Sequence, residues 1–298
     1  MLQALRHQNV NWDDLVPEDI LPLWEKWHTE LPLLQMLTFP CCLKPPGFGN
    51  PIRTKIHSFS DASDTSLGQI YLCMINQKNE VHVSFLMAKS RVAPLKAIFI
   101  VRLELMATAI SIHVATMLKS ELDIENILYY HTDSEMVIGY INNNARCFNV
   151  YIGNPVQHIR DHSTPGDWFH VPGKENPADE ASPGLTAKGL LENSRWFKGP
   201  QFLSQQDPLP FQTQPTCTLD PSDNEVRKET KSMLATKIDE CKTHQTYPEM
   251  LKPDCFNHFS SPPKMMYHSC SEGDCKIETK QTTQLASKGR TPDCTRSA

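Results

Sequence analysis

The chain has 298 residues, a formal net charge of −5 and 39% apolar residues, with 23 prolines but only 12 glycines. This length fits about two average domains, but the apolar share lies below the ~45–50% of typical globular proteins. Part of the chain is therefore expected to lack a core of its own. A strongly basic protein that wraps nucleic acid is excluded, so any nucleic-acid contact must depend on a local patch or on metal ions.

No segment approaches the roughly 18 uninterrupted apolar residues that a membrane helix needs, and the opening MLQALRHQNVNWDD lacks an apolar signal core. We expect an intracellular protein, cytoplasmic or nuclear, without a membrane partner. The ten cysteines are then expected to be reduced thiols. Cys-x-x-His pairs at 241–244 and 255–258 do not repeat their spacing and lack apolar support, which favours scattered thiols over a zinc site.

Residues 1–49 are predicted to form a short helical unit. Within 17–35, apolar residues recur at steps of four and three on one stripe of an amphipathic helix, namely Ile20, Trp24, Trp27, Leu31 and Leu34. Pro17 suits the first turn of such a helix. The apolar stripe must dock on another part of the chain, and the sequence FPCCLKPPGFGNP at 39–51 is typical of a linker.

Residues 50–203 are predicted to form an α/β domain. Strands at 56–61, 69–75 and 81–87 are rich in β-branched and aromatic residues and have short links, which indicates an antiparallel meander. The pattern then predicts a helix at 103–118, a strand at 126–130, a helix at 134–141, a strand at 168–171 and a helix at 176–191 with a Pro-Gly interruption at 183–184. A mixed sheet of about five strands with flanking helices follows.

Residues 204–298 differ from the rest of the chain. The segment begins Pro- and Gln-rich, later becomes polar with little Ile, Leu or Val, and contains one candidate helix at 225–241. We interpret it as a largely disordered tail.

Four acidic residues stand at the ends or starts of predicted elements. Asp61 ends the first strand, Glu104 lies in the apolar run IVRLELMA, Asp133 follows the central strand, and Asp179 opens the last helix. If the first and central strands are neighbours, Asp61 and Asp133 lie side by side at the carboxyl end of the sheet, within reach of Glu104. Converging carboxylates repel one another, and protonation or a bound cation relieves that repulsion.

Oxygen ligands without a partnering His or Cys favour a hard ion, Mg²⁺ or Mn²⁺. Two such ions about 3.5–4 Å apart form a two-metal centre that catalyses phosphodiester cleavage by in-line displacement. A net-acidic chain can act on a polyanion in this way because the ions supply the positive charge.

Each acid also has a purely structural explanation. Asp61 can close a strand-end turn, Asp133 can cap the helix at 134, and Asp179 suits the first turn of a helix. Glu104 interrupts the apolar face of a predicted helix. If that helix were rotated about its axis, Glu104 would instead be exposed to solvent beside Arg102. The order strand, helix, strand, helix lets all four meet and therefore favours a shared site.

An ordered series of blocks resembles the ribonuclease H region of BEL/Pao retrotransposon polyproteins: FSDAS, AKSRVAPLK, RLELMA, HTDSEMVIGYINN, FHVPGKENPADEAS and GLTAKGLLENSRWFKGPQFL. The resemblance runs from about residue 50 to 203 without large gaps. The upstream WDDLVPEDILPLWEKWHTELPLL resembles the end of the reverse transcriptase region that precedes it in those polyproteins. A single SDAS or TDS motif would be weak evidence for this family, but the ordered series of blocks is specific evidence for it.

The resemblance implies a type 1 ribonuclease H fold whose four-carboxylate site falls on Asp61, Glu104, Asp133 and Asp179. It implies two Mg²⁺ or Mn²⁺ ions, hydrolysis of the RNA strand of an RNA/DNA hybrid, and a reverse transcriptase domain as a partner. Cellular relatives often carry a His in the loop before the last acid. That loop here is 173–176, GKEN, so His170 is given no catalytic role.

Two functions fit these observations: a metal-dependent nuclease, or a catalytically inactive retroelement remnant that at most binds nucleic acid or protein. The four acids favour the nuclease. Val101, Pro155 and Pro183 depart from the family pattern. Pro155, which is expected to kink a predicted helix, and the disordered tail favour the remnant. The sequence contains no YxDD polymerase motif and no D-S/T-G peptidase motif, so neither of those activities is inferred.

Overall fold

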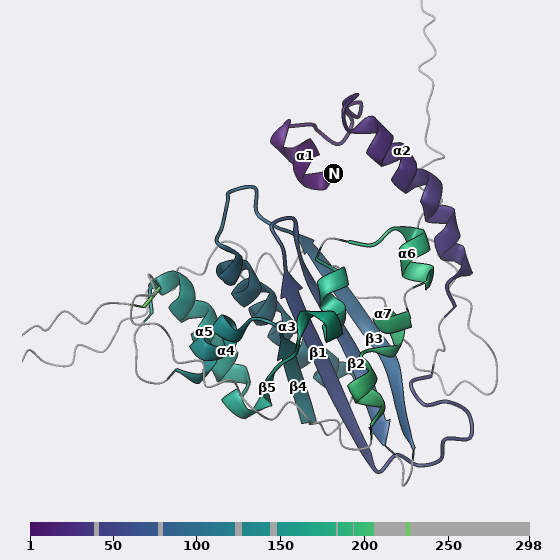
Figure 1. Cartoon of the computed structure of the whole chain (residues 1–298), viewed down its shortest axis with the longest axis vertical. Helices are drawn as coiled ribbons and strands as arrows, with labels where there is room; N and C mark the ends of the chain where they lie inside the picture. The colour runs from purple at the N-terminus through teal and green to yellow at the C-terminus, as the bar shows by residue number, and fades with distance from the viewer. Residues whose placement is uncertain are drawn as a thin grey trace, which may run out of the picture.

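The computed structural model describes residues 1–38, 42–76, 80–122, 127–143, 148–182, 184–192, 194–205 and 225–226. At its centre is a five-stranded sheet in the order β3-β2-β1-β4-β5, covered by helices on both faces (Figure 1). The strands are β1 (Arg53–Ala62), β2 (Ser66–Asn76), β3 (Val81–Val92), β4 (Ile127–Thr132) and β5 (Trp168–His170). The predicted α/β fold with a mixed sheet and flanking helices is confirmed.

The directions of the strands follow from their connections. Strands β1, β2 and β3 form the expected antiparallel meander, whereas β4 and β5 run parallel to β1. Short links can join only antiparallel neighbours, and the parallel strands are reached through helices. Strands β1 and β2 extend beyond the predicted ranges because polar ends still pair through the backbone, as Arg53 does with Asn76.

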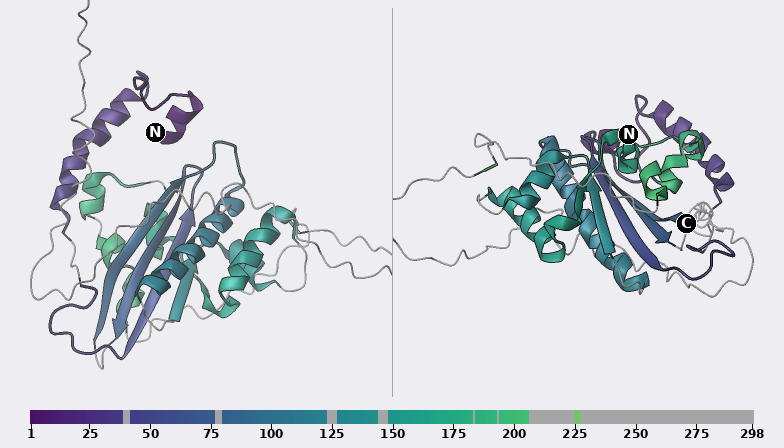
Figure 2. Two further views of the ribbon diagram at one scale, coloured as in Figure 1. Left: turned by 180° about the vertical axis from the view of Figure 1, so that it is seen from behind. Right: turned by 60° about the horizontal axis from the view of Figure 1, so that its bottom comes forward.

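Helix α3 (Ile100–Leu122) packs lengthwise on one face of the sheet (Figure 2). Its apolar side chains, Leu103, Met106, Ile110 and Val114 among them, are buried in the core. By length and composition alone α3 could cross a membrane, but most of it lies in the core, so its apolar character reflects packing. Trp168 is also buried there and stacks on Tyr130 with ring centroids 4.5 Å apart, which places this Trp in the core.

Helices α4 (Glu135–Asn142) and α5 (Val150–His162) complete this face. Helix α5 continues through the buried Pro155, so this proline does not end the helix, and the expected kink stays a prediction. Arg160 of α5 donates to the carbonyl of Ile141 from Nε at 3.0 Å and from Nη2 at 2.8 Å, and its Nη2 also reaches the carbonyl of Asn143. The last carbonyls of a helix lack partners within it. Arg160 therefore caps the C-terminus of α4.

Replacing Arg160 with Gln should lower the free energy of unfolding by about 1.5–3 kcal/mol, because hydrogen bonds from a charged donor are lost. Urea denaturation measures this change. The matched control is Arg53→Gln, since Arg53 is exposed at the start of β1. Equal effects of the two substitutions would contradict the capping role.

The opposite face of the sheet is covered by short turns that follow β5. Phe59, Ile70 and Leu72 of the sheet pack against Phe202 and Leu203. The latter two belong to the 3-10 helix η5 (Gln201–Ser204), which follows the short helix α7 (Ser194–Lys198). Residues from the two ends of the domain, more than a hundred positions apart at Phe59 and Phe202, therefore cover this face together.

Several predicted boundaries near the termini were wrong. The helix expected at 17–35 is α2 (Leu21–Glu30) followed by the 3-10 helix η1 (Leu31–Met36), and a shorter helix α1 (Leu2–His7) precedes it. Pro32 lacks the N–H that would continue the α-helical bonding, which explains the change. The apolar stripe is only partly covered, since Ile20 is 3% exposed but Trp27 is 46% exposed. Helix α2 lies beside α6 (Ala187–Glu192), as Figures 1 and 2 show.

The single helix expected at 176–191 was also wrong. Residues Pro177–Glu180 form the 3-10 helix η4, and α6 begins only at Ala187. Gly184 lies between them with a φ of +85°, a left-handed conformation that ends the first turn. Pro183 and the candidate Cys-x-x-His pairs lie outside the described residues, as does the predicted tail apart from 204–205 and 225–226.

Candidate active site

Strands β1 and β4 bring two of the predicted acids together. The parallel register pairs Ser60 with Thr132, so Asp61 and Asp133, the next residue of each strand, lie at the same end of the sheet. Asp61 is buried, whereas Asp133 is half-buried. The adjacency expected from the sequence is confirmed.

Glu104 reaches the same place from the second turn of α3. The hydroxyl of Ser134 donates to Oε2 of Glu104 at 2.6 Å and accepts from the N–H of Val137 at 3.3 Å. Ser134 is thus the N-cap of α4, which leaves the Asp133 carboxylate without the capping role that was its structural explanation. One serine therefore orients Glu104 and fixes the chain directly after Asp133.

Asp179 lies in η4, a turn that the sheet itself holds in place. Asn176 is fully buried, donates from Nδ2 to the carbonyl of Ser60 at 3.2 Å and accepts from the N–H of Ala178 at 3.1 Å. The hydroxyl of Ser63 donates to the carbonyl of Ser182 at 3.0 Å. Both ends of the turn are thus tied to β1 or to the residues that follow it.

The carboxylates interact electrostatically. The pKa of Asp133 is raised to about 7, mainly by burial and also by the charges of Asp61, Glu104 and Asp179, while a backbone hydrogen bond opposes the shift. Burial also raises the pKa of Asp61, with Asp179 adding to the effect and a hydrogen bond from Ser182 opposing it. Burial raises the pKa of Glu104 as well, with Ser134 opposing and Asp61 adding. All four predicted acids therefore converge on one cluster.

The cluster has the chemistry of a hard-cation site. Oδ1 of Asp133 is buried and accepts no hydrogen bond from any described residue. A cation would supply the missing partner, and it would also relieve the repulsion between the carboxylates. Among the described residues, however, no three His, Cys, Asp or Glu side chains stand in a ready metal-ligand arrangement. The oxygen donors are of the kind that Mg²⁺ or Mn²⁺ prefers.

Several residues that support the cluster were missed in the sequence. Ser134 and Asn176 hold the acids, and the Asn-Pro step at 176–177 is the signal that could have identified a helix cap. Arg195 of α7 donates from Nε to Glu180 at 3.0 Å and also reaches the carbonyl of Lys174, so it clamps the two loops beside Asp179. His170, given no catalytic role, makes a 3.1 Å contact from Nε2 to the carbonyl of Asp133.

A pair of buried histidines lies on the neighbouring strands β1 and β4. Nδ1 of His57 lies 2.9 Å from Nε2 of His131, and the His131 ring stacks on Phe59 at 4.5 Å. Burial lowers the pKa of His131 to about 3 and that of His57 well below its usual value, with the charges of His131 and Lys55 adding to the effect on His57. Both imidazoles are therefore neutral at neutral pH.

Acid should destabilise the fold through these histidines. Their folded pKa values are lowered, so the stability they contribute is fully present above about pH 6.5 and falls as the pH drops below it, by up to about 1.4 kcal/mol per pH unit for each ring. For His131 this loss continues down to its folded pKa of about 3. We expect His131→Gln to flatten this loss, measured as urea-unfolding free energies at pH 7, 6, 5 and 4. His28→Gln, at an exposed position, is the control. Identical slopes in the two variants would contradict the assignment.

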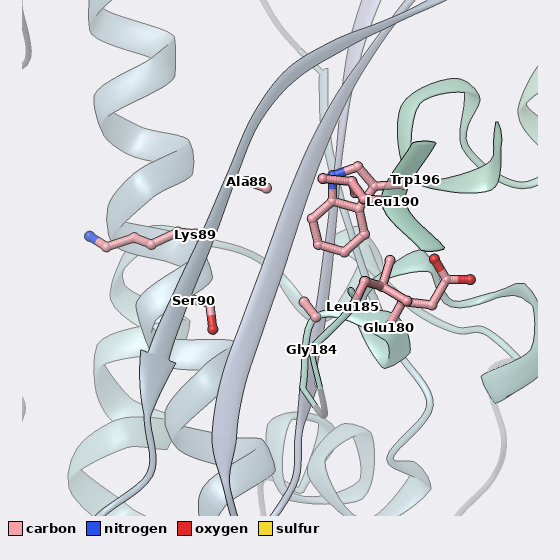
Figure 3. Close-up of a pocket in the computed structure, with 9 residues that line it drawn as sticks. Ala88, Lys89, Ser90, Glu180, Gly184, Leu185, Leu190 and Trp196 are labelled. Carbon is pink, nitrogen blue, oxygen red and sulfur yellow. The ribbon is translucent and has the colours of Figure 1, made fainter. Parts of the chain in front are cut away.

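A pocket of about 300 Å³ lies between β3 and the turns that follow Asp179 (Figure 3). Leu185, Leu190 and Trp196 line it, and Glu180 stands at its edge. The Lys89 side chain points away from the pocket in Figure 3. Glu180 instead forms an ion pair with Arg195.

The sheet order, the crossing helix and the carboxylates at the end of β1 and β4 define a ribonuclease H-like domain. Residues 1–134 match the family model described as "Pao retrotransposon-like RNaseH-like domain". The matched segment contains Asp61, Glu104 and Asp133 but ends before Asp179. It also includes the N-terminal helices, so their assignment to a reverse transcriptase end stays a prediction.

Three solved structures are similar to part of the chain. RNase H1 from the halophilic archaeon Halobacterium salinarum NRC-1 is 12% identical, with 47% of this chain and 99% of that chain covered and a TM-score of 0.30. LC11-RNase H1 in complex with an RNA/DNA hybrid is 15% identical, with 46% and 99% covered and a TM-score of 0.32. The N-terminal RNase H domain of a Mycobacterium tuberculosis protein is 11% identical, with 47% and 97% covered and a TM-score of 0.31. No curated protein matches the chain.

Proposed function

We propose that this chain hydrolyses the RNA strand of RNA/DNA hybrids and depends on two Mg²⁺ or Mn²⁺ ions. The observation that carries the proposal is Oδ1 of Asp133, buried without a hydrogen-bond partner among the described residues inside a cluster of carboxylates. A buried carboxylate oxygen left in this way costs stability, and a divalent cation is the ligand that removes the cost.

The roles of the residues follow from their positions. Asp61 and Asp133, at the ends of adjacent strands, would hold both ions, with Glu104 completing one site and Asp179 the other. When bound, the ions would lower the pKa of the attacking water and stabilise the leaving oxygen of the phosphodiester. Ser134 orients Glu104, and Asn176 holds the turn that carries Asp179. Asp133 must lose its proton to bind a cation, so activity should rise as the pH passes about 7.

The hybrid is proposed as substrate from the resemblance of the sequence blocks and from the family that residues 1–134 match. A reverse transcriptase domain, whose product is such a hybrid, is the proposed partner. The alternative, an inactive remnant, is favoured by one observation: the described residues contain no ready three-ligand metal set.

The test is cleavage of an RNA/DNA hybrid labelled on each strand in turn, beside RNA duplex and DNA duplex of the same sequence. We expect loss of the RNA strand of the hybrid only, with Mg²⁺ or Mn²⁺ and not with EDTA. Circular dichroism and thermal unfolding establish that the protein is folded. If the folded protein does not cleave the hybrid, the nuclease hypothesis is wrong and the inactive-remnant hypothesis stands.

A further inference from the structure

Strand β3 forms one edge of the sheet and carries two basic residues level with the carboxylates. Ser90 of β3 pairs with Gly68 of β2, and Gly68 pairs with Asp61 of β1. Lys89 and Arg91 stand directly before and after Ser90 in the strand. The register therefore places these two cations at the end of the sheet that carries the acids, two strands or about 10 Å away from β1.

A bulge in β3 decides which face of the sheet these side chains take. The register with β2 shifts between Phe85 and Met87, which leaves Leu86 as an extra residue. Phe85 packs on the face opposite α3, whereas Met87 packs in the cluster that contains α3. Since side chains alternate from Met87 onward, Lys89 and Arg91 both lie on the α3 face. Figure 3 agrees, because Lys89 points away from the pocket on the other face.

The two cations act on each other and on the neighbouring helices. The pKa of Lys89 is lowered, mainly by burial and also by the charge of Arg91. In α3, the pKa of His113 is lowered by burial first, and then by the charges of the same two cations and of His162 in α5. Basic residues from β3, α3 and α5 thus lie close enough to repel one another, and a bound anion relieves such repulsion.

This surface has the chemistry of a contact with a nucleic-acid backbone. Lys and Arg bind phosphates, and such contacts position a duplex without reading its sequence. A chain with a net charge of −5 repels a polyanion overall, so a local basic surface is needed to hold one. Edge strands also carry charged residues that prevent pairing with other chains, and that role would leave substrate binding unchanged.

We propose that Lys89 and Arg91 bind the sugar–phosphate backbone of the hybrid at a contact separate from the carboxylate cluster. The inference rests on the proposed function, because the hybrid is the proposed substrate. The phosphodiester that is cut lies at the acids, and the two cations hold another phosphate group about 10 Å to the side, on the β3 edge of the sheet. The contact adds affinity for the duplex without selecting its sequence.

The test measures hybrid binding by fluorescence anisotropy with the full chain in EDTA, so that no cleavage is needed. Lys89→Gln and Arg91→Gln should each raise the Kd about three- to tenfold at low salt and reduce the dependence of log Kd on log salt by about one unit. The double variant should reduce it by about two units. Sequence changes in the hybrid should leave these effects unchanged.

Three control variants separate charge from structure. Lys89→Arg and Arg91→Lys keep the charge and should keep the wild-type salt dependence. Lys119→Gln makes the same charge change at an exposed position in the last turn of α3, and it should shift the Kd less than twofold. Thermal unfolding of each variant checks the fold.

Salt dependences of Lys89→Gln and Arg91→Gln equal to that of Lys119→Gln would overturn the backbone contact and leave protection of the sheet edge as the role of these cations. No detectable hybrid binding by the folded wild type would overturn it too. The cleavage assay reports on the nuclease separately. A wild-type chain that shows the predicted salt dependences but does not cleave would sustain the contact and overturn the nuclease. Cleavage with unchanged salt dependences would do the reverse.

Discussion

Asp133→Asn is expected to reduce metal-dependent cleavage of the RNA strand by at least about a hundredfold, because even outer-shell metal residues are worth 10–100-fold. Asparagine keeps the shape of the side chain but cannot supply the charge that a divalent cation requires. The measurement is single-turnover cleavage of a labelled hybrid at saturating Mg²⁺. The control is Asp64→Asn, which removes an exposed acid three residues after Asp61. Equal losses in the two variants would contradict the role of Asp133.

The same substitution should stabilise the metal-free protein. The folded pKa of Asp133, about 7, lies above the unfolded value, so the stability that its protonated form contributes is fully present below about pH 4 and lost as the pH rises through 7. Removing the charge should therefore raise the unfolding free energy at pH 8 by about 1–2 kcal/mol, a value reduced for solvent screening of a half-buried group. Thermal unfolding in EDTA at pH 5 and pH 8 measures it. A variant less stable than wild type at pH 8 would contradict the repulsion between these acids.

Gly68→Val is expected to reduce activity strongly without changing an acid. Gly68 pairs with Asp61 across β1 and β2, and a Cβ at this position would lie 2.3 Å from the Cβ of Ala181 and 3.1 Å from the carbonyl of Ala178. The turn that carries Asp179 must then move away from the sheet. We expect a loss of about 1–3 kcal/mol in unfolding free energy, as for overpacked sites, and at least a tenfold loss of cleavage.

A compensating change tests this steric explanation. The smaller Gly68→Ala should also reduce activity, and adding Ala181→Gly should restore part of it, because the closest contact is removed. Cleavage rates and urea denaturation of the single and double variants measure the coupling between the two positions. Strictly additive effects of the two substitutions would exclude the clash as the cause.

The sequence predicts the parts of this protein that local pattern determines. Helical spacing from Leu103 onward identifies α3, and acids at the ends of two β-rich segments identify the end of the sheet where the carboxylates lie. The adjacency of Asp61 and Asp133 follows because parallel neighbours end at the same edge. Glu104 is recognisable because a charge in an apolar helix run needs a partner, which Ser134 supplies.

The parts that could not be predicted depend on contacts between distant residues. The helix expected at 176–191 fails because Asn176 bonds to Ser60, more than a hundred residues away, and holds a tight turn instead. The importance of Gly68 depends on Ala181, which approaches only in the folded state. The docking of Glu225 on Arg102 likewise joins a segment of the predicted tail to the domain. None of these pairings leaves a local pattern in the chain.

Equilibrium binding of Mn²⁺, followed by electron paramagnetic resonance, tests the carboxylate site most directly. With a non-cleavable hybrid present at pH 8, we predict about two ions per wild-type chain, weaker binding below pH 7, and loss of binding in a folded Asp133→Asn variant. Mn²⁺ binding that is absent from the wild type, or unchanged by Asp133→Asn, would contradict the proposal that these four acids form a metal site.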